Sequence, residues 1–357
     1  MKKTAAGFIA NGVMLLISIV VIAVGLELYV RYVEDDGMQF DLEMWKYAKT
    51  VKTISGNPRI GHEHRPNASA FLMGVNVTTN DAGFRNEPVP LEKRPGTVRV
   101  MMLGDSVLFG WGASQEGTVS ARLQAAWRQA GRNIEVINTG VGNYNTAMET
   151  EFFLTRGYRY RPDVVVLNYF INDAEPIPRY DYSWIERISA AWVYYASRLD
   201  VMERQFQIGP QTDWRSYYDG LYDDARNPSG WKTVEESVRK LADYCRSNRI
   251  RLLIVNYPEL RVLKPYPFSE VNRRLAALAS EVGAPYLDLL PALQDEPPES
   301  LWVTRPDPHP NDRAHGLFAE AIRQWLEREA PLPPVAASGT ATPLTGSVRT
   351  WRDGAKE

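Results

Sequence analysis

The sequence is poor in the residues that several common kinds of site require. It contains one cysteine, Cys245, among 357 residues, which excludes an intramolecular disulfide framework and an all-cysteine metal site. Only four histidines are present, at positions 62, 64, 309 and 315, so a catalytic histidine has few candidates. The 41 lysines and arginines are balanced by 43 acidic residues. This balance argues against a nucleic-acid binder that relies on bulk positive charge.

What the chain does contain is enough apolar sequence for a packed core. Apolar residues make up 44% of the chain and charged residues 24%, a composition that excludes wholesale disorder. The length allows one large domain or two ordinary ones. Residues 331–357 differ from the rest because Pro, Ala, Ser, Thr and Gly dominate there, and they predict a disordered tail.

The N-terminus carries a long uncharged run. Two lysines precede Thr4–Leu26, and Glu27 closes the run. As a helix the run rises about 34 Å, enough to cross a hydrocarbon core of about 30 Å. Because lysines favour the cytoplasmic side, residues 1–31 predict a membrane anchor that leaves the rest of the chain outside the cytoplasm, periplasmic or extracellular. A cleaved signal peptide is the alternative, since the Ala-Val-Gly segment at 23–25 resembles a small-x-small cleavage site.

Residues 32–94 form a juxtamembrane segment without a clear period. Within it, Phe71–Thr79 alternates weakly and predicts a strand that leads into a turn. His62 and His64 flank Glu63 in this segment. A His-x-His pair can bind a metal ion, but no further ligand accompanies it at a useful spacing. We therefore expect a solvated loop here and no metal site.

From Thr97 the chain alternates between apolar strand patterns and helical patterns. Strands are expected at 97–103, 134–138, 163–169, 251–256 and 285–289, and helices at 118–130, 146–158, 234–246, 269–282 and 312–328. This alternation predicts a parallel sheet covered by helices on both faces, a doubly wound three-layer α/β/α sandwich over residues 95–330. An insertion at about 175–229, rich in Tyr and Trp and with a helix around 183–199, is either a wall of the substrate site or a structural cap.

The ends of the expected strands carry the residues with catalytic chemistry. Ser106 follows the first strand, Gly140 the second and Asn172 the third, and Asp307 and His309 precede the last helix. Functional groups of an open parallel sheet gather at the carboxyl ends of its strands. We therefore expect these five residues to lie on one rim.

Each of these residues fits a step of acyl transfer. A serine hydroxyl becomes nucleophilic when a base removes its proton, and His309 is the candidate base. Asp307 can fix the tautomer of that imidazole. The oxyanion of the tetrahedral intermediate needs hydrogen-bond donors, and Ser106 N–H, Gly140 N–H and the Asn172 amide are the candidates.

Taken together, the blocks at Gly104-Asp105-Ser106, at Gly140, at Asn172 and at Asp307/His309 resemble the SGNH (GDSL-like) hydrolase family. The resemblance spans about residues 97–329, with the blocks in the family's order. It implies a flavodoxin-like sandwich, a Ser-His-Asp triad, no metal or cofactor, and attack on esters, often O-acetyl groups.

Two positions depart from the family's pattern. The family's acid usually stands three residues before the histidine, where this chain has Pro306. Asp307 stands two residues before His309 instead, so Asp312, or a backbone carbonyl serving a Ser-His dyad, remains an alternative partner for the imidazole. The second departure is Phe170, which replaces a glycine two residues before Asn172 and is expected to narrow the acyl pocket.

Other motifs and residues are weaker evidence for a functional site. The segment Gly140–Asn145 follows a strand as a dinucleotide fingerprint would, but it lacks the third glycine and the later acid. We expect no nucleotide to bind there. Asp105 and Asp173 are expected to be supporting hydrogen-bond acceptors, and His315 to be structural.

These features predict a membrane-anchored serine esterase that acts outside the cytoplasm on ester-linked acyl groups of envelope polysaccharide or lipid. The expected partners are this substrate and the membrane, without nucleic acid or cofactor. Two alternatives stay open: an O-acyltransferase that uses the same triad on an exported glycan, and an inactive anchored scaffold or glycan-binding protein.

Overall fold

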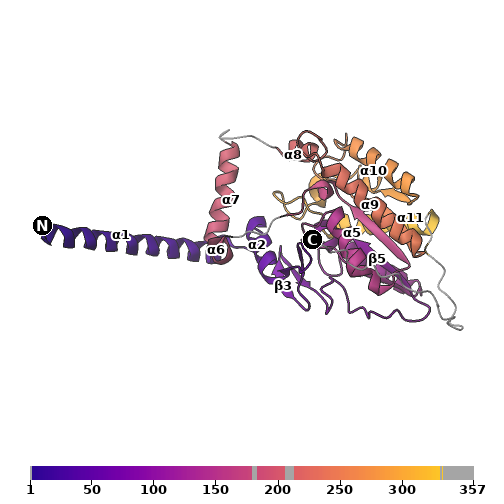
Figure 1. Cartoon of the computed structure of the whole chain (residues 1–357), viewed down its shortest axis with the longest axis horizontal. Coiled ribbons are helices and arrows are strands. Elements are labelled where there is room, and N and C mark those ends of the chain that lie inside the picture. Colours follow the sequence, from indigo (N-terminus) through magenta and orange to yellow (C-terminus); the bar gives the residue numbers. More distant parts are fainter. Residues whose placement is uncertain (1, 179–182, 206–212, 330–331, 333–357) are drawn as a thin grey trace, which may run out of the picture.

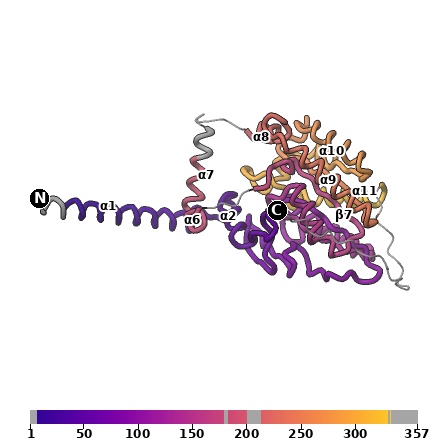
Figure 2. Tube along the Cα trace, viewed as in Figure 1, coloured from indigo at the N-terminus to yellow at the C-terminus, as the bar shows by residue number. Residues whose placement is uncertain are grey.

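The computed structural model describes residues 2–178, 183–205, 213–329 and 332. Figure 1 shows one long helix, α1 (Lys2–Tyr29), projecting from the layered body that the rest of the described chain forms. The tube in Figure 2 shows the same arrangement, with α1 extending away from that body. The tail predicted to be disordered lies outside the described residues, apart from Leu332.

The body is built on a five-stranded parallel sheet with the strand order β6-β5-β7-β8-β9. Its strands are β5 (Val98–Leu103), β6 (Ile134–Asn138), β7 (Val164–Tyr169), β8 (Arg251–Asn256) and β9 (Tyr286–Asp288). In chain order this is the 2-1-3-4-5 arrangement of flavodoxin-like folds. Every residue of β5 and β7 is buried, as expected for central strands covered on both faces. The predicted fold class is confirmed.

Helices cover both faces of the sheet. On one face, α4 (Val119–Gln129) and α11 (Asp312–Arg328) enclose a core with alternate buried residues of β5 and β7. On the other face lie α5 (Thr146–Thr155), α9 (Gly230–Ser247) and α10 (Ser269–Val282). The amphipathic spacing of α4, α9, α10 and α11 explains why these helices lie where the sequence predicts them, because each buries one apolar stripe against the sheet. The helix α5 is instead buried over most of its residues.

The segment before the sheet is more structured than its sequence suggests. A π-helical turn (Val30–Glu34) continues α1, and α2 (Phe40–Thr50) follows. Two antiparallel pairs come next: β1 (Lys52–Ile54) with β2 (His62–His64), and β3 (Ser69–Leu72) with β4 (Val75–Thr78).

The single strand expected at Phe71–Thr79 is wrong. The chain reverses at Met73 and Gly74, whose φ angles are +48° and +74°. Positive φ at both central residues is what a tight two-residue hairpin turn requires, and glycine adopts it without steric cost. One alternating stretch therefore becomes two short strands.

The described residues of the insertion form the helices α6 (Trp184–Ile188), α7 (Ala190–Gln205) and α8 (Trp214–Leu221). The remaining elements are the four-residue α3 (Ser106–Phe109) and the 3-10 turns Gly157–Tyr160, Ile171–Ala174, Leu290–Ala292 and Pro298–Leu301. The helix predicted around 183–199 is present but interrupted at Ser189, which has extended backbone angles.

Candidate active site

Ser106 lies where the central strand β5 meets α3. Asp105 caps this short helix, because its Oδ1 accepts a hydrogen bond of 2.8 Å from Val107 N. Ser106 is the first residue of α3, so its N–H has no acceptor within the helix. The hydroxyl and the N–H of Ser106 are thus presented together at the carboxyl edge of the sheet.

His309 reaches Ser106 from the loop between β9 and α11. Its Nε2 lies 3.0 Å from Ser106 Oγ, although the two residues are 203 positions apart. Its Nδ1 lies 2.5 Å from Asp307 Oδ1. The Asp307 side chain is fully buried, whereas the His309 side chain keeps 22% of its surface exposed. The imidazole therefore connects a buried carboxylate to an accessible hydroxyl.

The Asp-Pro-His spacing does not keep the acid away from the histidine. Asp307 Oδ1 accepts a second hydrogen bond, of 3.2 Å, from His309 N. Asp307 Oδ2 accepts one of 2.9 Å from Trp111 Nε1, a residue that the sequence analysis did not single out. Asp312 instead accepts hydrogen bonds from Ser114 N and Oγ, at 2.8 and 2.6 Å. Of the two acids, Asp307 is the one against His309.

The two charges perturb each other in opposite directions. Burial alone would lower the pKa of His309, but the adjacent Asp307 carboxylate outweighs it and holds that pKa above its ordinary value. Burial would likewise raise the pKa of Asp307, but His309 and the hydrogen bonds to this carboxylate hold it below its ordinary value. The pair is therefore suited to an ionised acid that stabilises an imidazolium.

Gly140, expected as an oxyanion donor, has its N–H occupied. That N–H donates to Asn138 Oδ1 at 2.9 Å. The backbone itself lies close to α3, since a Cβ added to Gly140 would sit 2.4 Å from Phe109 N. Asn172 lines the pocket beside His309, and its side chain also forms a hydrogen bond that lowers the pKa of Asp105. Of the three expected oxyanion donors, Ser106 N–H and the Asn172 amide therefore remain candidates in this conformation.

The pocket over these groups is small, with a volume of about 220 Å³. Three aromatic side chains line it from different regions of the chain: Phe40 from α2, Phe170 after β7, and Tyr218 from α8 of the insertion. The Phe40 ring stacks on His309 with 6.1 Å between ring centroids. Arg261 also lines the pocket and pairs with buried Glu259 at 2.5 Å. Phe170 lines the pocket as expected, and Tyr218 shows that the insertion, left open between wall and cap, contributes to the pocket lining.

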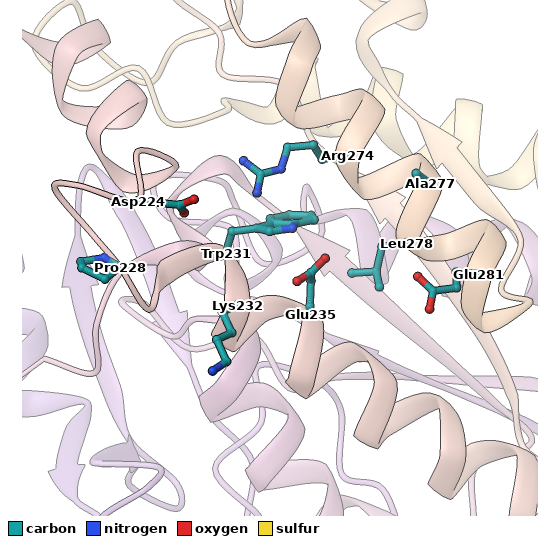
Figure 3. A pocket seen from close by; sticks show the side chains of 9 residues that line it. All are labelled: Asp224, Pro228, Trp231, Lys232, Glu235, Arg274, Ala277, Leu278 and Glu281. Atoms are coloured by element: carbon teal, nitrogen blue, oxygen red, sulfur yellow. The ribbon is translucent and has the colours of Figure 1, made fainter.

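A second hollow lies between α9 and α10, and it shares no lining residue with the first. Figure 3 shows the Arg274 guanidinium extending over the Trp231 ring, with Glu235 below them. The distance from the guanidinium carbon to the ring centroid is 4.7 Å. Glu281 at the far end is paired with Arg239. This open groove presents charged groups of both signs and holds neither Ser106 nor His309.

The segment from Phe40 to Asn86, here called the N-terminal brace, contacts the loops of the rim. Lys52 Nζ donates to Gly142 O at 2.6 Å and to Asn143 Oδ1 at 2.8 Å. His62 Nε2 lies 2.8 Å from the same Gly142 carbonyl. Tyr47 OH accepts from Gly142 N at 3.0 Å. In the loop that follows Gly140, side chains of the brace thus hold both the N–H and the carbonyl of Gly142.

The solvated loop expected at His62 and His64 is wrong. Both side chains are buried, and His64 Nε2 lies 2.6 Å from Tyr47 OH. Burial lowers the pKa of His62 to about 2 and that of His64 to about 3, so both rings are neutral. Among the described residues no group of three His, Cys, Asp or Glu side chains is arranged to hold a metal ion.

A second part of the brace supports the segment after Ser106. Arg85 is buried, and its guanidinium donates to three backbone carbonyls, those of Phe109, Gly110 and Ala113. Burial lowers the pKa of Arg85 to about 10, so it stays charged at neutral pH. These bonds fix the chain as it leaves α3, a role that no motif in the sequence indicates.

Three further carboxyl groups are buried close to the end of β5. Asp173 Oδ2 accepts from the Thr146 hydroxyl at 3.1 Å, as expected of a supporting acceptor. Burial raises the pKa of Asp105, Glu149 and Asp173, and mutual repulsion raises those of Glu149 and Asp173 further.

His315 is also buried, and burial lowers its pKa to about 3.

Comparison with protein families gives one match. Residues 102–317, well over half of the chain, match the GDSL-like lipase/acylhydrolase family. No curated protein matches the chain.

Solved structures similar to the chain include three esterases or acylhydrolases. A lipase/acylhydrolase from Enterococcus faecalis is 15% identical, with 68% of this chain and 100% of that chain covered and a TM-score of 0.42. An acetylxylan esterase from Geobacillus stearothermophilus is also 15% identical, with 69% and 100% covered and a TM-score of 0.42. The esterase EstA from Pseudoalteromonas is 13% identical, with 64% and 99% covered and a TM-score of 0.40.

The matched range includes Ser106, Gly140, Asn172, Asp307 and His309. On that match, and with the predicted fold present, the chain belongs to the GDSL-like lipase/acylhydrolase (SGNH hydrolase) family and is a hydrolase that acts on ester bonds.

Proposed function

We propose that this protein is a serine esterase that removes short ester-linked acyl groups, with Ser106 as nucleophile, His309 as general base and Asp307 as its orienting acid. One observation carries the proposal: the unbroken contact from Asp307 through His309 to Ser106, at 2.5 and 3.0 Å, at an accessible pocket.

The proposed reaction has two halves. Ser106 Oγ attacks the ester carbonyl carbon while His309 Nε2 takes the hydroxyl proton, and the tetrahedral oxyanion forms beside Ser106 N–H and the Asn172 amide. The bond from carbon to the alcohol oxygen then breaks, and His309 returns the proton to the leaving alcohol. Water repeats the attack on the acyl-serine with His309 as base, which releases the carboxylic acid and restores Ser106.

The size of the pocket favours a small acyl group. Its 220 Å³ is below the range of about 300–1,000 Å³ typical of drug-sized ligands. Phe170 occupies a wall where the family has glycine, and Phe40 closes the side next to His309. We infer an acetyl-sized group on a polar alcohol such as a sugar, with Arg261 at the pocket edge as a hydrogen-bond donor.

The N-terminal helix supports a proposal for where the site lies. Gly7–Glu34 is apolar and long enough to cross a membrane, by length and composition. The chain continues as a helix beyond the apolar run. There, Glu27 and Arg31 form hydrogen bonds with α6 and α7. These contacts favour a retained anchor over a cleaved leader. With two lysines preceding the span, we propose that the catalytic body lies outside the cytoplasm and acts on envelope polysaccharide or lipid esters.

The test is hydrolysis by the full-length protein in detergent. We expect p-nitrophenyl acetate to be cleaved faster than the octanoate by at least about tenfold in kcat/KM, since a longer chain cannot enter the pocket. Acetylated xylan, with and without an unacetylated oligosaccharide acceptor, reports hydrolysis against transfer. Activity on neither ester, with the protein folded, would overturn the proposal. Transfer that exceeds hydrolysis would replace the esterase by an acyltransferase.

A further inference from the structure

The insertion presents an apolar face to solvent at the point where α1 meets the body. Four large side chains of α6 and α7 are strongly exposed: Trp184 at 73%, Ile188 at 59%, Trp192 at 48% and Leu199 at 59%. Along α7 the exposed positions Trp192, Ala196 and Leu199 recur at spacings of four and three residues. They therefore form one stripe of the helix. Grouped apolar side chains of this size on a surface indicate a contact with something apolar.

The opposite face of α7 is packed. Ala190, Ala191 and Tyr194 form a buried cluster with Val30, from the turn after α1, and with Leu42 of α2. Trp45 of α2 also donates to the Glu186 carbonyl of α6 at 2.6 Å. One side of α7 is thus fixed to the membrane-proximal helices, and the stripe points away from that contact.

The depth of α7 is set by the residue that ends the apolar run of α1. Glu27 is the first charged residue after Thr4–Leu26. Its carboxylate accepts hydrogen bonds from Ala190 N and Ala191 N, both at 3.0 Å, and from Ser189 Oγ at 2.7 Å. Arg31 donates to the Ile188 carbonyl at 3.0 Å. The start of α7 therefore lies at the level where an inserted α1 would leave the hydrocarbon.

The direction of α7 fits the same boundary. In Figure 1, α7 runs across the direction of α1 at the junction of α1 with the body. If α1 stands along the bilayer normal, α7 lies along the bilayer surface. Trp and Tyr are enriched at this level of membrane proteins because their rings are apolar with a polar edge. The exposed aromatic Tyr32 after α1 lies in the same zone.

We propose that the stripe of Trp192, Ala196 and Leu199, together with exposed Trp184 and Ile188, is a membrane-surface docking site whose occupant is the lipid bilayer that holds α1. It is continuous with the span of α1, and it has the pattern of an interfacial helix with its apolar face in the headgroup region. Because α2 packs on α7 and carries Phe40, which stacks on His309, the docked helix fixes how the pocket faces the membrane.

The proposal is tested on the full-length protein reconstituted in vesicles of phosphatidylcholine and phosphatidylglycerol. An environment-sensitive fluorophore is attached at Trp192→Cys or Leu199→Cys, and at the exposed control Ser280→Cys on α10. Cys245 is buried, so the unsubstituted protein measures background labelling. We expect brominated lipids to quench the probes at 192 and 199 several-fold more than the probe at 280, and aqueous iodide to show the reverse order.

Two results would overturn the proposal. Equal quenching by iodide at 192, 199 and 280 places the stripe in water. Protection of 192 from iodide without quenching by brominated lipid means that protein, a second copy or another subunit, covers it.

A second experiment introduces charge into the stripe and measures whether lipid quenching is lost. With the probe at Ile188→Cys, Trp192→Glu combined with Leu199→Glu is expected to abolish lipid quenching. The matched pair Trp192→Phe with Leu199→Met is expected to retain it. Unchanged lipid quenching in the Glu pair, with the chain still in the vesicles, would contradict docking through this stripe.

Discussion

The sheet rim and the N-terminal brace contribute to one pocket in different ways. The rim supplies the reacting groups, since Ser106 follows β5 and His309 lies in the loop before α11. The brace supplies contacts: Lys52 holds the Gly142 carbonyl, Arg85 holds the carbonyls after α3, and Phe40 covers the His309 ring.

This difference shows which region provides the reacting groups of the site and which region fixes their positions. A parallel sheet brings distant residues to one edge by topology alone. The loops at that edge still have to be held within fractions of an ångström for catalysis, and here a segment outside the sheet holds them. Substitutions of the reacting residues at the rim should therefore abolish catalysis, whereas substitutions in the brace should lower kcat by smaller factors.

The largest effect is expected for Ser106→Ala and for His309→Ala. Each should lower kcat by about a millionfold, because nucleophile and base act as a unit. Hydrolysis of p-nitrophenyl acetate by the full-length protein measures the loss, and circular dichroism with a thermal scan checks the fold. A loss of less than tenfold in a folded variant would assign the chemistry to other residues.

The next effect separates two neighbouring acids. Asp307→Asn should lower kcat by about ten-thousandfold, because the imidazole loses the carboxylate that fixes its tautomer. Asp312→Asn is the matched control, since Asp312 bonds Ser114 and not His309. It should leave kcat within about tenfold of the unsubstituted protein. The reverse order would make Asp312 the partner of the histidine.

A smaller loss is expected in the brace. Lys52→Met removes two hydrogen bonds to the loop of Gly142, each of which contributes about 0.5–1.5 kcal/mol, while His62 Nε2 still contacts the Gly142 carbonyl. We expect kcat to fall about tenfold to a hundredfold, with KM nearly unchanged. Lys93→Met is the control, because Lys93 pairs with Asp163 before the start of β7, at the other edge of the sheet. Equal losses in both variants would make the effect one of stability alone.

The smallest effect is a shift in a pH profile. Since the pKa of His309 is raised above its ordinary value, mainly by Asp307 against the opposing effect of burial, the base is protonated and inactive below that pKa. We expect kcat/KM to rise with pH through a midpoint above about 6.5. In Asp307→Asn the residual activity should show a lower midpoint. A plateau that continues unchanged to pH 5 would contradict this assignment.

The sheet was predictable because its signals are local. Val164-Val165-Val166-Leu167 is an uninterrupted apolar run typical of a doubly covered strand, and α10 and α11 begin and end where their periodicity does. The residues at the strand ends could be assigned to one rim because parallel strands share a direction. The contact of Asp307 with His309 was open, since the spacing of two residues across Pro308 allows more than one orientation.

The brace was not predictable from the same signals. His62 and His64 stand in a three-residue strand, and their burial follows from packing: His64 against Tyr47 and Phe109, and His62 against Tyr144. The occupied N–H of Gly140 depends on Asn138, a buried side chain at the end of β6. Neither contact produces a hydrophobic periodicity in the sequence, because each joins two elements through single side chains.

The most direct measurement is the reaction of the full-length protein with a fluorophosphonate, followed by mass mapping of the modified peptide. We expect one adduct, on Ser106, formed rapidly in the unsubstituted protein, more slowly in Lys52→Met, and at background in His309→Ala. An adduct on another serine, or equal rates in all three proteins, would contradict it.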